Sequence, residues 1–168
     1  MAPPSEANAS TNVEAIAKTA VNESLLYAAA KCESGDVDAL RAKLADADDW
    51  ALSYLAYACA SNIAQAIALL DENVLEAFVL GVEGDDVCTT CFPVTLVLRV
   101  TRHTAALESL VSNLEDEIRS YLEQDAALSV GVLLEIRVVE DEDVRARRGL
   151  GAAIRSMWTP ALKVWERK

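Results

Sequence analysis

One phrase recurs along this chain of 168 residues: a pair or cluster of acidic residues followed by an apolar run that carries small side chains. It occurs at Asp48-Asp49, at Asp85-Asp86 and at Asp141-Glu142-Asp143. Acidic residues favour the start of a helix, where their side chains accept hydrogen bonds from free backbone N–H groups. Recurrence of such a phrase is typical of stacked helical units, none of which can bury its apolar face alone. The pattern predicts an all-α fold that presents a binding surface rather than a catalytic pocket.

The composition is consistent with closely packed helices. Hydrophobic residues make up 52% of the chain and aromatic residues only 5%, while the 6 glycines and 4 prolines are too few for an all-β fold with many turns. The length fits one domain with a substantial core. We expect residues 1–10 to form a disordered tail and residues 11–168 to form a single helical-repeat domain.

The charge is large and unevenly distributed. The formal net charge is −12, yet residues 144–168 hold seven basic residues and one acidic residue. The large negative charge argues against affinity for nucleic acid or for an anionic membrane surface, because both are negatively charged themselves. The basic C-terminal helix predicted below could still dock on an acidic surface of a protein partner, although charged terminal helices are often simply solvated.

The run Trp50–Leu70 contains no Asp, Glu, Lys or Arg and has the length of a membrane span. Polar residues interrupt it, and acidic residues without basic anchors flank it on both sides. Two buried helices joined near Ser61-Asn62 account for the run better than a span does. The first residues lack the features of a secretory signal, so we expect a cytoplasmic protein that does not cross a membrane.

Apolar periodicity and capping residues predict the following helices. They run over 11–33, from Asp36 through Leu44, from Asp48 or Asp49, from Ile63 through Leu80, from Asp85 or Asp86 to about His103, over 104–125, and from Asp143 to about Trp158.

Two β-branched runs leave a structural alternative open. Residues 94–101 and 130–139 are rich in Val and Ile, which favour strands. With the helix between them they could form a βαβ unit, so the alternative is an α+β fold. Neither run alternates between apolar and polar residues, and both occur where the recurring phrase expects helices. For these two reasons the all-α interpretation is preferred.

The sequence around the acidic phrases is similar to armadillo and HEAT repeats. In the stretch 132–154, an apolar segment ends in Glu142-Asp143-Val144-Arg145, and a run rich in small residues follows. Residues 74–87 and 40–56 carry weaker copies of this pattern of an apolar segment followed by an acidic turn. The resemblance implies an α-solenoid of about three repeats that acts as a protein-interaction scaffold without catalysis. The spacing from Asp49 to Asp86 suits one repeat, whereas the spacing from Asp86 to Asp143 requires an insertion or a long helix near 104–125.

The candidate chemical residues are few. Cys88 and Cys91 form a CxxC motif, which serves redox chemistry or metal binding when a strand and a helix N-terminus position it. The neighbouring acids Asp85 and Asp86 would raise the thiol pKa values, so buried thiols are the simpler interpretation. Cys32, Cys59 and the single histidine, His103, complete the potential ligands. The acidic clusters lack the ligand spacing of a calcium loop. We expect no metal and no cofactor.

These observations favour a non-catalytic interaction scaffold or adaptor subunit of a larger assembly, with protein partners. The alternative is a small α+β domain whose cysteine pair is active in metal binding or redox chemistry. A subunit whose active site lies on another chain would look the same as the scaffold. Because Trp and Arg are enriched at binding hot spots, the interface is expected at the C-terminal end, and the alternative is that both Trp side chains there close the core. The residues expected there are Arg145, Arg148, Arg155, Trp158 and Trp165.

Overall fold

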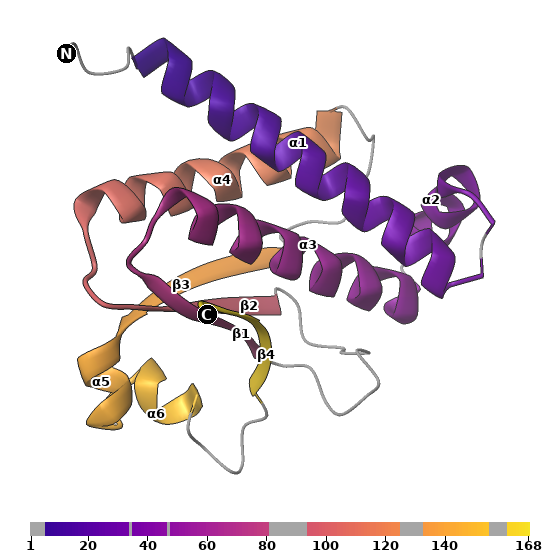
Figure 1. The fold of residues 1–168 in the computed structure, drawn as a ribbon. Coiled ribbons are helices and arrows are strands. Elements are labelled where there is room, and N and C mark those ends of the chain that lie inside the picture. The colour runs from indigo at the N-terminus through magenta and orange to yellow at the C-terminus, as the bar shows by residue number, and fades with distance from the viewer. Residues whose placement is uncertain (1–5, 34, 47, 81–93, 125–132, 155–160) are drawn as a thin grey trace.

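The computed structural model describes residues 6–33, 35–46, 48–80, 94–124, 133–154 and 161–168 (Figure 1). In these residues a helical layer covers a four-stranded sheet. The order is α1 (Glu6–Lys31), α2 (Val37–Ala45), α3 (Asp49–Leu70), β1 (Val74–Leu80), β2 (Val94–Val100), α4 (Ala105–Gln124), β3 (Leu134–Glu140), α5 (Asp141–Arg145), α6 (Leu150–Ile154) and β4 (Ala161–Glu166).

The sheet is mixed, with the strand order β3-β2-β1-β4. β1 pairs antiparallel with β2 on one side and with β4 on the other, while β2 and β3 run parallel. Parallel neighbours need a crossover connection, and α4 provides it between β2 and β3. The outer strand β3 is tied to this helix, because Glu115 of α4 accepts a hydrogen bond from the Ile136 backbone N–H at 2.8 Å.

Alternate residues of β2 face opposite sides of the sheet, as the pleat requires. Leu96 and Leu98 belong to the main core beneath the helices, whereas Val97 packs with Val144 of α5 in a second, smaller core. Figure 1 shows α1, α3 and α4 on one side of the sheet and α5 and α6 on the other. The sheet is therefore apolar toward the long helices and partly apolar toward the short ones.

The main core is formed by α3, which packs against α1 and against the sheet. The buried side of α3 is largely made of alanines together with Leu55, Ile63 and Ile67. Small residues allow helices to approach closely, and the branched residues fill the remaining space. α4 contributes the apolar side that its sequence predicts, with Leu107, Leu114 and Leu122 fully buried.

Several sequence predictions are confirmed. Asp36 caps α2 by accepting from the Ala39 N–H at 2.7 Å, and Asp48 caps α3 by accepting from the Ala51 N–H at 2.9 Å. The helix expected over 104–125 is α4, and the helix expected over 11–33 is α1, which ends at Lys31 before a glycine with positive φ. α1 begins at Glu6, so residues 6–10 are helical where a disordered tail was expected.

The all-α solenoid prediction is wrong, because four of the described segments form a sheet. β1 occupies residues expected to extend a helix through Leu80, and β3 precedes the third acidic phrase where a helix was expected. The helix expected from Asp143 to about Trp158 is likewise replaced, within the described residues, by the two short helices α5 and α6. The strands of the α+β alternative are present, as β2 and β3 with α4 between them.

The run Trp50–Leu70 forms one continuous helix, so the predicted join near Ser61-Asn62 is wrong. In the described part of the chain, α3 is the one helix that is long and apolar enough to cross a membrane, and 56% of its apolar window is buried inside the fold. Packing in the core thus accounts for the apolar residues in just over half of this window. The uncharged residues on the exposed side of α3 need a separate explanation.

One arginine side chain, Arg167, hydrogen-bonds both to the sheet and to the C-terminal end of α3. From its place after β4, Arg167 donates hydrogen bonds to the carbonyl oxygens of Val74 at 2.8 Å, Ala68 at 2.8 Å and Asp71 at 3.1 Å. The last turn of α3 has no basic residue of its own. A cation at a helix C-terminus stabilises the free carbonyl groups there.

We predict that Arg167→Ala lowers the free energy of unfolding by about 1.5 kcal/mol, because it removes charge-assisted hydrogen bonds from three carbonyls. Urea denaturation followed by circular dichroism measures this change. Arg119→Ala is the control, since its ion pair with Asp116 lies on the exposed side of α4 and is worth less than about 0.5 kcal/mol. Equal losses in the two variants would contradict the capping role.

Candidate functional site

The structure separates the residues expected at the C-terminal interface. Arg145 is largely exposed and its Nε lies 2.8 Å from Asp141, while Arg148 lies 3.0 Å from Asp143. Trp165 is on β4, packs against the main core, and has the Arg167 guanidinium 5.1 Å from its ring centroid. Arg155 and Trp158 lie outside the described residues. The described members thus divide between the short helix α5 with its following turn and the last strand.

The candidate chemical residues do not form a reaction centre among the described residues. No three His, Cys, Asp or Glu side chains there group so as to hold a metal ion. Cys32 and Cys59 are free thiols, and complete burial raises the pKa of Cys59 to about 11. His103 lies in the connection before α4, where its backbone N–H donates to Glu140 at 3.0 Å. Cys88 and Cys91 lie outside the described residues.

A network of charged side chains lies on the side of the sheet that faces α5. Arg99 of β2 binds Glu76 of β1 at 2.5 Å, and its Nε lies 2.7 Å from Asp141 at the start of α5. Lys163 of β4 reaches the same Glu76 at 2.8 Å. The network therefore joins three strands and α5, with the Glu76 side chain only 14% exposed.

The charges of this network neutralise one another. Burial alone would raise the pKa of Glu76, but hydrogen bonds from Lys163 and Arg99 outweigh it and hold the pKa below its usual value. Ion pairing with Asp141 and Glu76 likewise raises the pKa of Arg99 despite partial burial. Charges that are paired in this way stabilise an arrangement of elements. We interpret the network as a structural clasp between the sheet and α5.

The exposed side of α3 is the most unusual surface in the described part of the molecule. The chain has 27 acidic and 15 basic residues, yet α3 carries none from Trp50 to Leu70. Its outward residues recur every three or four positions, as on one side of a helix. They are Trp50, Tyr54, Tyr57, Ser61, Gln65 and Leu69. We call this surface the α3 face.

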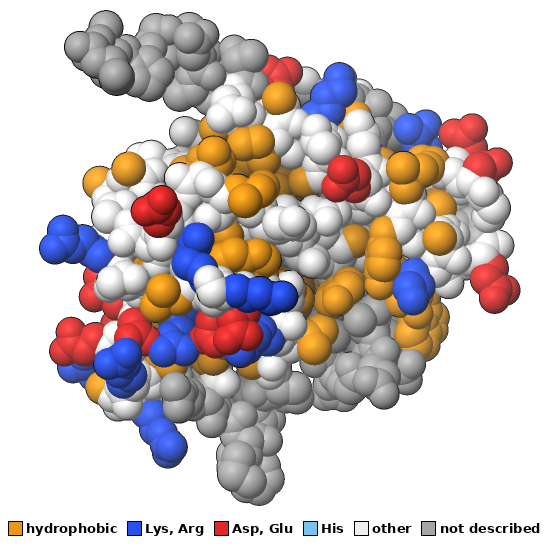
Figure 2. All heavy atoms as spheres, viewed as in Figure 1, with side chains coloured by type: hydrophobic (Ala, Val, Ile, Leu, Met, Phe, Trp, Pro, Cys, Tyr) orange, Lys and Arg blue, Asp and Glu red, His pale blue; other side chains and the backbone are white. Residues whose placement is uncertain are grey.

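The large exposed hydrophobic side chains of the described residues all lie on α1 and α3. Leu69 is 80% exposed, Leu26 of α1 is 63% exposed and Trp50 is 45% exposed. Figure 2 shows hydrophobic side chains along this side of the molecule, whereas charged side chains crowd the region near α5. Trp50 and Leu69 lie near opposite ends of α3, so exposed hydrophobic side chains occur along the length of the α3 face.

Four aromatic residues meet at one end of the α3 face, and we call them the aromatic patch: Tyr27, Trp50, Tyr54 and Tyr57. The ring of Tyr54 lies 5.9 Å from that of Trp50 and 6.5 Å from that of Tyr27, which in turn lies 6.1 Å from Tyr57. The whole chain has only three Trp, four Tyr and two Phe. One Trp and three Tyr therefore meet at the surface, where rigid amphipathic rings favour binding.

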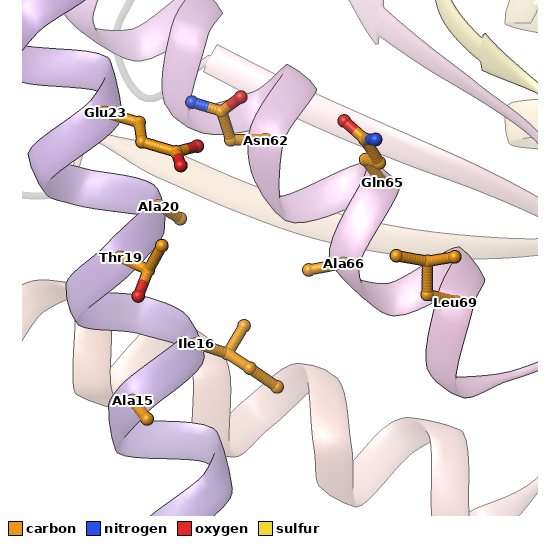
Figure 3. Close-up of a pocket in the computed structure, with 9 residues that line it drawn as sticks. All are labelled: Ala15, Ile16, Thr19, Ala20, Glu23, Asn62, Gln65, Ala66 and Leu69. Atoms are coloured by element: carbon orange, nitrogen blue, oxygen red, sulfur yellow. The ribbon is translucent and has the colours of Figure 1, made fainter.

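A groove of about 360 Å³ lies at the other end, between α1 and α3 (Figure 3). Ala20 and Ala66 leave room for it, and Ile16 and Leu69 border it. One end is polar, where Glu23 faces Asn62 and Gln65 across the groove.

The two helices are held in register beneath the groove by a buried polar contact. Asn62 of α3 donates to the Ser24 hydroxyl of α1 at 3.0 Å, and that hydroxyl donates to the Ala20 carbonyl at 2.6 Å. The walls of the groove are thus held by hydrogen bonds as well as by packing. A surface held in this way is largely preformed, so little ordering is needed on binding.

Comparison with models of known protein families, with curated proteins and with solved structures gives no match. The interpretation of the surface therefore depends on its own geometry.

Sequence reasoning placed the interface at the C-terminal end and missed the α3 face. The signal was present in the absence of charge from Trp50 to Leu70, which the sequence analysis attributed to burial. A fully buried helix does not require polar residues such as Ser61 and Gln65 at the spacing of one helical side. That regular spacing on an uncharged helix is the signal that could have identified an uncharged exposed face.

We predict that Glu76→Gln changes how stability depends on pH. The pKa of Glu76 is lowered in the folded protein, so its stabilising effect is complete above the unfolded value near 4.5 and is lost as the pH falls through the folded value. At pH 7 the variant should be less stable by about 2 kcal/mol, because Gln offers one acceptor oxygen in place of two and no negative charge to Arg99 and Lys163. Below pH 4.5 the difference should shrink toward zero.

Urea denaturation at intervals from pH 7 to pH 3 measures this difference. Glu123→Gln, on the exposed side of α4, is the matched control and should follow the wild type at every pH. A constant gap between Glu76→Gln and the wild type at all pH values would show that the carboxylate charge is not what stabilises the clasp.

Proposed function

We propose that this protein is a non-catalytic binding module, an adaptor or subunit of a larger assembly, which docks on a partner protein through the α3 face. The observation that carries the proposal is the uncharged exposed side of α3 in a chain of net charge −12. The opposite side of α3 forms the core, and of the α3 face Tyr54 alone is among the partly buried hydrophobic residues that pack against that core in the described chain. Interface centres are depleted of charge and enriched in Tyr and Trp, as this surface is.

Two further features support a protein partner. The aromatic patch and the groove lie along one helix, so a single partner can contact both. The acids that flank α3, at Asp48-Asp49 and Asp71-Glu72, do not provide the basic anchors typical of a membrane surface. The cytoplasm remains the expected location of such a module.

We predict that a photo-crosslinking amino acid at Gln65 or Leu69 forms one discrete adduct in cells that make this protein, and that the same amino acid at Ser109 does not. Ser109 is equally solvent-exposed but lies on α4. Mass spectrometry identifies the adduct, and the purified partner is then titrated against the wild type.

The matched pair for that titration is Leu69→Arg and Ser109→Arg, which add the same charge. Leu69→Arg should weaken binding by about tenfold or more, since a charge is placed on the apolar border of the groove, while Ser109→Arg leaves it unchanged. Both sites are exposed, so the thermal midpoints of the two variants should stay close to that of the wild type. Adducts of equal yield from both helices would contradict the proposal, and an adduct of two copies of this chain would assign the face to self-association.

A further inference from the structure

We infer that the partner element is an amphipathic helix, which lays its apolar side along the α1–α3 groove and places one arginine side chain against the aromatic patch. This inference rests on the binding role proposed for the α3 face.

The groove has the form that receives a helix. Two neighbouring helices, α1 and α3, form its walls, and alanines at Ala20 and Ala66 keep it open (Figure 3). Side chains of an incoming helix pack into such a channel as ridges into a groove. Helix-in-groove recognition uses apolar anchors spaced three or four residues apart, which matches the apolar border formed by Ile16, Ala66 and Leu69.

The aromatic patch borders a second cavity, of about 400 Å³, suited to a cation. Trp50 and Tyr54 line it together with Glu33 and Asp48, so aromatic rings and carboxylates border the same space. A guanidinium stacks on Trp and Tyr rings and can also pair with the exposed Glu33 carboxylate, while Asp48 already accepts the capping hydrogen bond from the Ala51 N–H. The cavity therefore favours arginine.

Two lysines also line this cavity, and each has a contact of its own. Lys43 donates to the Cys32 carbonyl oxygen at 2.9 Å, and the Lys31 ammonium lies 5.7 Å from the centroid of the Tyr27 ring. The second contact shows that a ring of this patch already binds a cation. Within the described residues, the cation–ring contacts involve neither Trp50 nor Tyr54.

The distance between the two cavities fixes the length of the partner helix. Tyr54 borders the aromatic cavity and Gln65 borders the groove, and both lie on α3. Eleven residues separate them, which corresponds to about 16 Å along a helix. A partner helix of about three turns or more, with its arginine 11 residues from its apolar anchor, spans both sites.

Charge favours this partner over a second copy of the chain. The large exposed hydrophobic residues of the described chain all lie on α1 and α3, so two copies would have to pair these helices symmetrically. Residues 6–71, which include both helices, hold ten acidic and four basic residues. Symmetric pairing would bring two such acidic layers together, whereas a cationic helix is attracted to one.

The test uses three synthetic 18-residue helical peptides with the same leucine face. They carry arginine, its neutral isostere citrulline, or phenylalanine at the position 11 residues from one leucine. Fluorescence anisotropy measures their binding to the wild type, to Trp50→Leu and to Leu69→Arg, at 0.15 M salt in each case.

We expect the arginine peptide to bind about fivefold more tightly than the citrulline peptide, a difference typical of a partly exposed cation–ring contact. Trp50→Leu should abolish that difference, and Leu69→Arg should weaken both peptides by about tenfold. Ser109→Arg again serves as the control and should behave as the wild type.

The other outcomes overturn the inference in distinct ways. No binding of any peptide would remove the helix as occupant, even where crosslinks from Gln65 and Leu69 uphold the proposed function. Equal binding of the arginine and citrulline peptides would remove the cationic anchor, and tighter binding of the phenylalanine peptide would assign the patch to an aromatic anchor. A dimer by light scattering that Leu69→Arg dissociates would assign the face to a second copy.

Discussion

The position of α3 between α1 and the sheet is the constraint on which the rest of this structure depends. Its inner side is alanine-rich, so the helix can approach both neighbours closely and bury Leu55 and Ile63 completely. The same helix can bury only one side. Its other side must face outward, and in this chain that side carries no charge. The core and the proposed binding surface are therefore two sides of one element.

The two sides of the sheet differ in the side chains that they carry. Toward the long helices it presents Leu96, Leu98 and other apolar residues, while toward α5 it presents Val97 together with the paired charges of Arg99 and Glu76. Burial of a charge is costly unless a partner is present, so each of these groups has one. The clasp positions α5 against β2 without a large apolar contact. This arrangement leaves the hydrophobic surface of the described chain concentrated on the α1–α3 side.

Local signals in the sequence predicted local structure well. The caps at Asp36 and Asp48 and the amphipathic helix α4 follow from rules that act over a few residues. The βαβ alternative was also available, because the Val-rich run of β2 has a clear strand preference. The strand lacks the expected alternation of apolar and polar residues, because Val97 faces α5 and is as apolar as its neighbours, which face the long helices. The sequence did not predict the short helices that cover Val97.

The β1 strand was missed for a geometric reason. Its pairing with β2 shifts between Val74 and Glu76, so a bulge changes which side later residues face. The buried residues of β1 are Val74, Ala77, Phe78 and Val79, and the step of three positions after Val74 departs from the alternation of a regular strand. The α3 face has a local signal, because Ser61 and Gln65 recur at the spacing of one helical side. The groove beside it has none, since its shape depends on where α1 packs against α3.

The hydrogen bonds of Arg167 to α3 and β1 can form only after β4 has been synthesised. β4 is the last of the described elements to be made, and until it pairs, β1 has an unpaired edge on that side while the last carbonyls of α3 lack their guanidinium partner. A ribosome-bound intermediate that already contains α1 through β3 would thus carry an open strand edge, which is a template for aggregation. Closure of the sheet must wait until β4 has been made, so a pause in synthesis before this strand would prolong the exposure of the β1 edge.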